Sequence, residues 1–141
     1  MSSASVRAAF RTQVAGLLSG SGFDFIESVN RAESVTELPQ RWYTLDFAVA
    51  GDQRMSLGVP TLFREQGTVT VVIFTEQNIE DAAATNAAEV VRAALANWNA
   101  LDGHLHVQQA APPADLAGGD FRGSFYGVMV DIGYTFDRIV S

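Results

Sequence analysis

The clearest pattern in the sequence is an alternation of apolar with small or polar residues near its C-terminal end. Side chains of a β-strand point alternately to its two faces, so this period of two predicts one long strand with a buried face and an open face. The positions assigned to the buried face are Tyr126, Val128, Val130, Ile132, Tyr134 and Phe136, and those assigned to the open face are Gly127, Met129, Asp131, Gly133, Thr135 and Asp137.

Two further segments have strand patterns. Residues 41–50 alternate in the same way, which is typical of a half-buried strand. Residues 68–75 are a nearly continuous β-branched and aromatic run, which predicts a central strand covered on both faces. Gly51 and Asp52 indicate a turn, and the alternation of Met55, Leu57 and Val59 before Pro60 predicts a short return strand, so a hairpin is expected here.

Two helices are predicted from apolar residues at helical spacing. The first ends at Gly20 and Gly22, and its stripe is Val6, Phe10, Val14, Leu17 and Leu18. The second is capped by Asn78 and ends near Gly103, and its stripe is Ile79, Ala83, Ala87, Val90, Val91, Ala94, Leu95 and Trp98. Residues 22–40 between the first helix and the first long strand are expected to be a loop with one short strand. Together these elements predict a single α+β domain over residues 1–141, with an antiparallel or mixed sheet and two helices packed on one of its faces.

Charge and the absence of cysteine narrow the possible functions. Sixteen acidic residues against nine arginines and no lysine give a net charge of −7, which opposes binding to nucleic-acid phosphates. The chain has no cysteine, which excludes disulfides, thiolate metal sites and cysteine nucleophiles. No apolar run approaches the roughly 18 residues of a membrane helix, and the first residues lack the pattern of a secretory signal. We therefore expect a cytoplasmic product.

A search for catalytic and metal-binding groups yields no convincing site. His104 and His106 would share a face of a short strand over residues 104–108, but a third metal ligand is missing, so we interpret them as solvent-facing. Asp46 and Asp131 would form a glycosidase-like carboxylate pair if their strands were neighbours. Solvated strand residues, or charges lining an assembly, are the favoured interpretation. We predict no catalytic, cofactor-binding or metal-binding residue and no enzyme activity.

Two segments are candidates for contact with other proteins. Arg64-Glu65-Gln66-Gly67 is predicted to be a turn before the central strand, in which Arg64 and Glu65 either pair locally or reach a neighbouring subunit. Residues 110–120 (AAPPADLAGGD) are predicted to be a mobile loop, in which Pro112 and Pro113 reduce the entropic cost of ordering on a partner.

The open face of the closing strand is the third candidate contact. Met129, Asp131 and Gly133 are residues of this face. Small and acidic groups of this kind suit close packing between subunits or the wall of a channel.

The order of these features resembles the tail terminator family of long-tailed phages and gene transfer agents, over nearly the whole chain. The resemblance consists of an N-terminal helix, a strand with Trp42 and Tyr43, the stretch 56–60 (SLGVP), residues 64–67 (REQG) opening a Val-rich strand, an Ala-rich helix and a long closing strand.

The resemblance implies a structural protein of a virion or related particle. Such a protein forms a ring, typically hexameric, on the finished tail tube, stops its polymerisation and provides the joint to the head connector. The implied partners are copies of the chain itself, the tail tube protein and a head-completion or connector protein, with no cofactor and no membrane. DNA would pass through the lumen without specific binding, and an acidic wall containing Asp131 would favour that passage.

Three alternatives remain at this point. The first is another head–tail joining protein or a minor tail protein, which shares small α+β folds and ring symmetry with tail terminators. The second is a ligand-binding or enzymatic α+β domain with a cleft under its helices. The third is an antitoxin-like or regulatory dimer, which the acidic charge permits.

Overall fold

The computed structural model describes residues 4–26, 39–55, 58, 61–76, 81–121 and 125–140. These residues contain two α-helices, α1 (Ala4–Leu18) and α3 (Asp81–Leu95), and a short 3-10 turn, η1 (Ser19–Ser21). Their strands are β1 (Asp24–Phe25), β2 (Arg41–Arg54), β3 (Thr61–Glu76), β4 (Asn99–Ala100), β5 (Leu105–Ala110), β6 (Ala114–Phe121) and β7 (Phe125–Val140). The strands form a sheet in the order β1-β2-β3-β7-β5-β4, and β6 pairs separately with β7.

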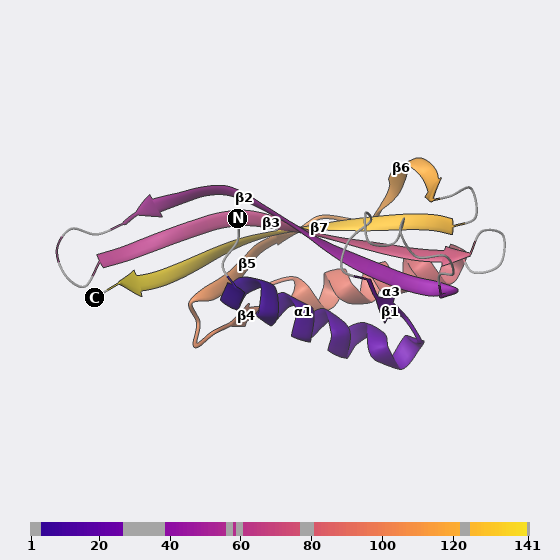
Figure 1. Cartoon of the computed structure of the whole chain (residues 1–141), viewed down its shortest axis with the longest axis horizontal. Coiled ribbons are helices and arrows are strands. Elements are labelled where there is room, and N and C mark those ends of the chain that lie inside the picture. The colour runs from indigo at the N-terminus through magenta and orange to yellow at the C-terminus, as the bar shows by residue number, and fades with distance from the viewer. Residues whose placement is uncertain are drawn as a thin grey trace.

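The predicted α+β class and mixed sheet are confirmed. β1 pairs with β2 in parallel, and the other strand pairs are antiparallel. Both helices lie on one face of the sheet, which we call the inner face, and β6 lies toward the other, outer face (Figure 1). None of the helices in the described ranges is long and apolar enough to cross a bilayer.

The centre of the sheet is the pairing of β3 with β7. Each strand has sixteen residues. They pair without a register shift from Thr61 opposite Val140 to Glu76 opposite Phe125. The closing strand that the alternation predicts is thus paired with β3 along its whole length. β2 flanks β3 on its other side along almost the same length.

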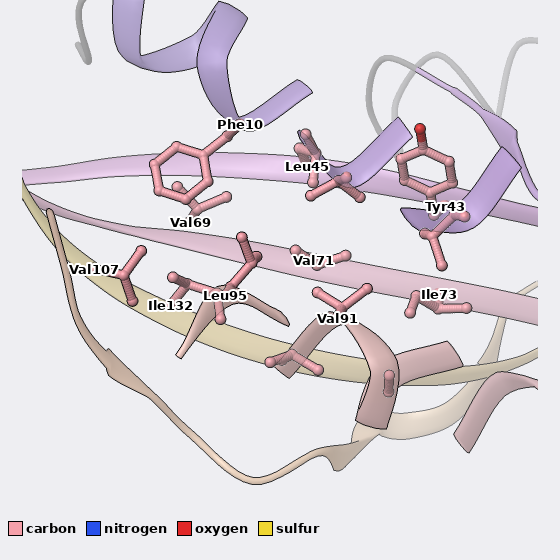
Figure 2. Close-up of a cluster of buried hydrophobic side chains, with 14 of the residues drawn as sticks. Phe10, Tyr43, Leu45, Val69, Val71, Ile73, Val91, Leu95, Val107 and Ile132 are labelled. Carbon is pink, nitrogen blue, oxygen red and sulfur yellow. The ribbon is translucent and has the colours of Figure 1, made fainter. Parts of the chain in front are cut away.

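The main core lies between the helices and the inner face. Val6, Phe10, Val14 and Leu18 of α1 are buried, as the helical spacing predicts. The ring of Phe10 packs against two other aromatic rings, with its centroid 5.2 Å from that of Trp98 and 5.5 Å from that of Tyr134. Figure 2 shows the other side chains of this core, which include Tyr43, Leu45, Val69, Val71, Ile73, Val91, Leu95, Val107 and Ile132.

A second apolar cluster lies on the outer face. Trp42, Val72, Phe74 and Phe125 are buried in it, and Met129 packs against it. The rings of Trp42 and Phe74 are stacked, with centroids 4.0 Å apart. The predicted burial of residues 68–75 on both faces is therefore confirmed where this cluster covers β3.

The predicted hairpin after residue 50 is wrong. β2 continues through Gly51 and Asp52 to Arg54, and a bulge between Val49 and Gly51 accommodates the extra residue. The glycine marks this bulge instead of a turn. Of the predicted return strand, Met55 follows β2 directly, while Leu57 and Val59 lie outside the described residues.

The predicted turn at residues 64–67 is also wrong. These residues lie inside β3 and pair with β2 on one side and with β7 on the other. Gly67 is opposite Tyr134, and a Cβ atom on Gly67 would lie 2.6 Å from the carbonyl oxygen of Ala48 and 2.7 Å from the Tyr134 hydroxyl. Gly67 therefore permits a close approach of the Tyr134 side chain, and it is not needed for a positive φ.

The second helix ends earlier than predicted. α3 stops at Leu95, and Asn97 has a left-handed backbone with φ of 65°. Leu101, Asp102 and Gly103 then have positive φ in succession, which forms a tight turn into β5. Val90 of the predicted apolar stripe is 49% exposed, and the stripe is instead completed by Ala84 and Ala88. Asn78 and Ile79 lie outside the described residues.

The predicted mobile loop over residues 110–120 is largely strand. Ala110 ends β5, residues 111–113 connect it to β6, and β6 pairs with the first half of β7. The long β7 offers a ladder edge that β5 covers only in its second half, so β6 can pair with the rest. Pairing of backbone groups thus outweighs the Gly and Pro content from which the loop was predicted.

Three strands continue beyond the main core as an arm, which we define as residues 49–54 of β2, 61–67 of β3 and 134–140 of β7; Tyr134 and Phe136, at the base of the arm, still belong to that core. In Figure 1 the arm is the left part of the sheet, ending near the C-terminus. Its strands pair from Val49, Gly67 and Tyr134 outward. The arm is one plate made of segments that are distant in sequence.

We predict that Gly67→Ala destabilises the fold by about 1–3 kcal/mol, because a Cβ atom there meets backbone and a buried ring. Gly133→Ala is the matched control, since its Cβ would meet only ordinary contacts at 3.8 Å and beyond. Urea unfolding midpoints measure both. Equal midpoints for the two variants would contradict the close approach at Gly67.

Candidate interaction surface

The middle of the outer face carries small and acidic side chains. Asp46, Thr70 and Asp131 form one row across β2, β3 and β7. The next row toward the arm is Ala48, Thr68 and Gly133. The Thr70 hydroxyl donates a hydrogen bond of 2.6 Å to the Asp131 carboxylate, while Asp46 is exposed.

Asp46 and Asp131 do not lie on neighbouring strands. β3 separates β2 from β7, and a strand spacing of roughly 4.8 Å places the two backbones about 10 Å apart. Thr70 lies between them and engages Asp131. The row therefore places two carboxylates on one face, and its main physical effect is a local negative potential.

Arg64 pairs within the chain. Its Nε lies 2.7 Å from Asp137 Oδ1 and its terminal nitrogen 2.9 Å from Oδ2, which is a bidentate contact across β3 and β7. The hydrogen bond from Arg64 lowers the pKa of Asp137 despite partial desolvation, and the same bond raises the pKa of Arg64. This pair aligns the two strands of the arm.

Glu65 and Gly67 are buried, which is a correction to their predicted place in a contact surface. The Glu65 side chain is on the inner face of the arm, is 5% exposed and accepts a 2.7 Å hydrogen bond from the Tyr134 hydroxyl. Gly67 lies under the Tyr134 ring. Both residues hold Tyr134 in place, since a buried carboxylate needs hydrogen-bond donors.

The predicted open face of β7 is open only in its middle. Met129 is half-buried against the second apolar cluster, and Thr135 is buried beside Gln66 and His106 of the neighbouring strands. Asp131 and Gly133 remain partly exposed between them. The face differs from the prediction because the second apolar cluster covers it at one end and β5 covers it at the other.

Pro112 and Pro113 lie in the connection between β5 and β6. Pro112 is exposed and Pro113 is half-buried. The connection is attached to the sheet, because the N–H of Ala111 donates a 2.9 Å hydrogen bond to the carbonyl of Asp131. Its role in partner contact stays a prediction.

Exposed apolar side chains are the feature that the sequence patterns did not single out. The large ones are Phe25, Met55, Val90, Leu101 and Ile139. A signal for Ile139 existed, because the alternation of β7 continued past Phe136 assigns it to the polar face. Phe25, Met55 and Leu101 lie at strand ends or in a turn, where periodicity does not separate exposed from buried positions. Val90 lies on α3, where helical spacing predicts burial, so its exposure contradicts the pattern.

Neither a metal site nor a similarity to known proteins assigns a function to this chain. His104 and His106 are both exposed, and across the described ranges no three histidine or acidic side chains gather in a way that could hold a metal ion. The chain matches no model of a known protein family and no curated protein. A functional proposal therefore depends on the surfaces themselves.

We predict that Tyr134→Phe lowers the free energy of unfolding by about 1–3 kcal/mol, because the buried Glu65 carboxylate loses one of its donors. Tyr126→Phe is the control, since the bond from Tyr126 to Asp115 is exposed. Urea unfolding of the two variants measures the difference. If Tyr134→Phe lowers the free energy of unfolding as little as Tyr126→Phe does, the buried hydrogen bond contributes little to stability.

The Arg64–Asp137 pair predicts a specific pH dependence. The folded-state pKa of Asp137 is lowered, so its contribution to stability is complete above the unfolded value of about 3.9 and is lost as the pH falls through the folded value. The gap in urea midpoint between the parent chain and Arg64→Met should therefore be largest near neutral pH and shrink below about pH 4.

Arg138→Met is the comparison variant for this pH series. Arg138 pairs with Asp52 where both side chains are exposed, so its removal should change stability less. A gap between the parent chain and Arg64→Met that stays constant down to pH 2.5 would contradict the role of Asp137.

Proposed function

We propose that this protein is a tail terminator, a structural subunit that forms a ring, of six copies by the family resemblance, on the end of a tail tube. The ring stops tube growth and provides the joint to the head connector. The observation that carries the proposal is the long plate of β2, β3 and β7, whose outer face carries small and acidic side chains in the middle. The helices cover the inner face, so the plate has one face available to a lumen.

Electrostatics support a lumen wall on this face. Asp46 and Asp131 share one row across the plate, and the chain as a whole carries a net charge of −7. In a ring, copies of this row would present a band of negative charge to passing DNA. Repulsion between the band and the phosphates prevents adhesion during transfer.

The edge of β2 supports assembly. Among the described strands, β1 pairs with β2 only at Trp42 and Tyr43, and no described strand pairs with this edge over residues 44–53. Unpaired strand edges are common sites of association with other chains. The exposed apolar side chains also support assembly, because such groups are often covered in assemblies.

A ligand-binding module is the second candidate function. A hollow of ≈ 420 Å³ lies between α1 and residues 98–101, within the size range of small-molecule pockets. Its lining is mainly apolar, with Ala8, Ala9 and Trp98 among its residues. This hollow favours an apolar ligand, whereas the acidic plate on the other face has no role in such a module.

Imaging with tail tubes tests the proposed function. The purified chain should form rings or caps on the ends of tubes assembled from tail-tube subunits, and it should limit their length, as seen by negative-stain microscopy and native mass spectrometry. A chain that stays monomeric, caps no tube and leaves tube length unchanged would contradict the proposal.

Charge reversal tests the lumen wall separately. Asp131→Arg should leave ring formation intact and reduce DNA delivery by particles, because it places positive charge in the band. Asp131→Asn keeps the side-chain shape and should have a smaller effect. Glu89→Arg makes the same charge change on the exposed side of α3 and should have none. Unchanged delivery with Asp131→Arg would count against the assignment.

A further inference from the structure

Large exposed apolar side chains lie at both ends of the molecule. Ile139 belongs to the arm, which forms one end of the long axis, and Met55 directly follows the β2 strand of the arm. The strand β1, which contains Phe25, lies toward the opposite end (Figure 1), where Val90 of α3 lines a hollow together with the last residues of α1. Two different apolar patches on one chain are suited to contact each other between copies.

Ile139 is the protruding group at the arm end. Its side chain is 58% exposed, the highest fraction among the large apolar residues of the described ranges. Its backbone also faces an open edge. The N–H of Asp137 donates to the carbonyl of His104 at 2.9 Å, so the N–H of Ile139, two residues on, points to the same side, beyond the last β5 pairing at Phe136.

A hollow of ≈ 170 Å³ lies at the opposite end, between the end of α1 and α3. Its apolar lining includes Leu17, Phe23, Ala87 and Val90, and Ser21, Arg41 and Asn86 add polar groups. A single branched aliphatic side chain is of a size to occupy it. Polar groups beside it are suited to hydrogen-bond the backbone of an inserted strand end.

The helical patterns indicate that this hollow is incompletely filled in one chain. Spacing assigns both Leu17 and Val90 to the buried stripes of their helices. In the folded chain Leu17 is only half-buried and Val90 is 49% exposed, and both line the hollow. A second copy that covers Leu17 and Val90 would bury the exposed part of both apolar stripes.

We infer that Ile139 of one copy inserts into the hollow beside Val90 of the next copy. This inference rests on the proposed ring and names its subunit contact. The protruding residue and the hollow lie at opposite ends of the chain. When two copies join, one Ile139 and one hollow of the pair therefore stay unoccupied. Association therefore continues head to tail until the chain of subunits closes.

Charged substitutions test the contact. Ile139→Arg and Val90→Arg should each raise the concentration needed for half-assembly at least tenfold, alone and on tube ends, because they place a positive charge in a mainly apolar contact beside Arg41. Ile139→Val and Val90→Ile keep the contact apolar and should assemble like the parent chain. Analytical ultracentrifugation and native mass spectrometry measure assembly. Urea unfolding should show that all four variants fold, since both positions are exposed.

Mixing the two charged variants tests the direction of association. Val90→Arg retains a functional Ile139, and Ile139→Arg retains a functional hollow, so an equal mixture should form pairs of one copy each and nothing larger. Charged variants that assemble like the parent chain would overturn the contact and leave the ring intact. A parent chain that stops at a dimer would overturn head-to-tail association, and one that neither assembles nor caps tubes would overturn the proposed function as well.

Discussion

The uninterrupted ladder between β3 and β7 is the constraint on which the rest of the structure depends. It joins two strands of sixteen residues over their whole length. The inner face of these strands supplies the apolar surface that α1 and α3 cover, and both strands extend beyond the main core as the arm. A shorter ladder would leave a compact two-layer domain without an arm, and the two ends of the molecule would not be separated.

The arm needs its own stabilisation because no helix covers it completely. Tyr134 provides it by lying across Gly67 and donating to the buried Glu65. On the other face, the bidentate contact between Arg64 and Asp137 aligns the same two strands. These two contacts on opposite faces restrain the arm, and a rigid arm can hold Ile139 in position for a neighbouring copy at a low entropic cost.

Periodic patterns predicted the elements and the fold class, while the ends of elements needed tertiary information. The alternation in residues 126–136 and the helical spacing in α1 identify their strand and helix because burial on one face imposes the pattern. Gly51 and Gly67 do not form the predicted turns, since a glycine supports a turn, a bulge or a close approach equally well and only its neighbours decide. The same holds for residues 110–120, whose backbone finds a partner in β7 that no local signal indicates.

The candidate surfaces were predictable in part. Asp131 and Gly133 lie on an accessible part of the outer face, as the alternation predicts, whereas Glu65 is buried by its bond to Tyr134. The exposure of Val90 depends on how α1 and α3 pack, which helical spacing alone does not determine. In the proposed ring, such residues are buried between copies and the rows of Asp46 and Asp131 face a common lumen, so both the apolar ends and the polar plate have a role.

Disulfide cross-linking measures the central contact most directly, since the chain has no native cysteine. A chain carrying both Ile139→Cys and Val90→Cys should, on oxidation during assembly with tube subunits, give a ladder of linked copies that ends at one closed species. Chains with either substitution alone should give at most a dimer. A doubly substituted chain that assembles on tubes yet gives no linked species larger than a dimer would contradict head-to-tail assembly through these residues.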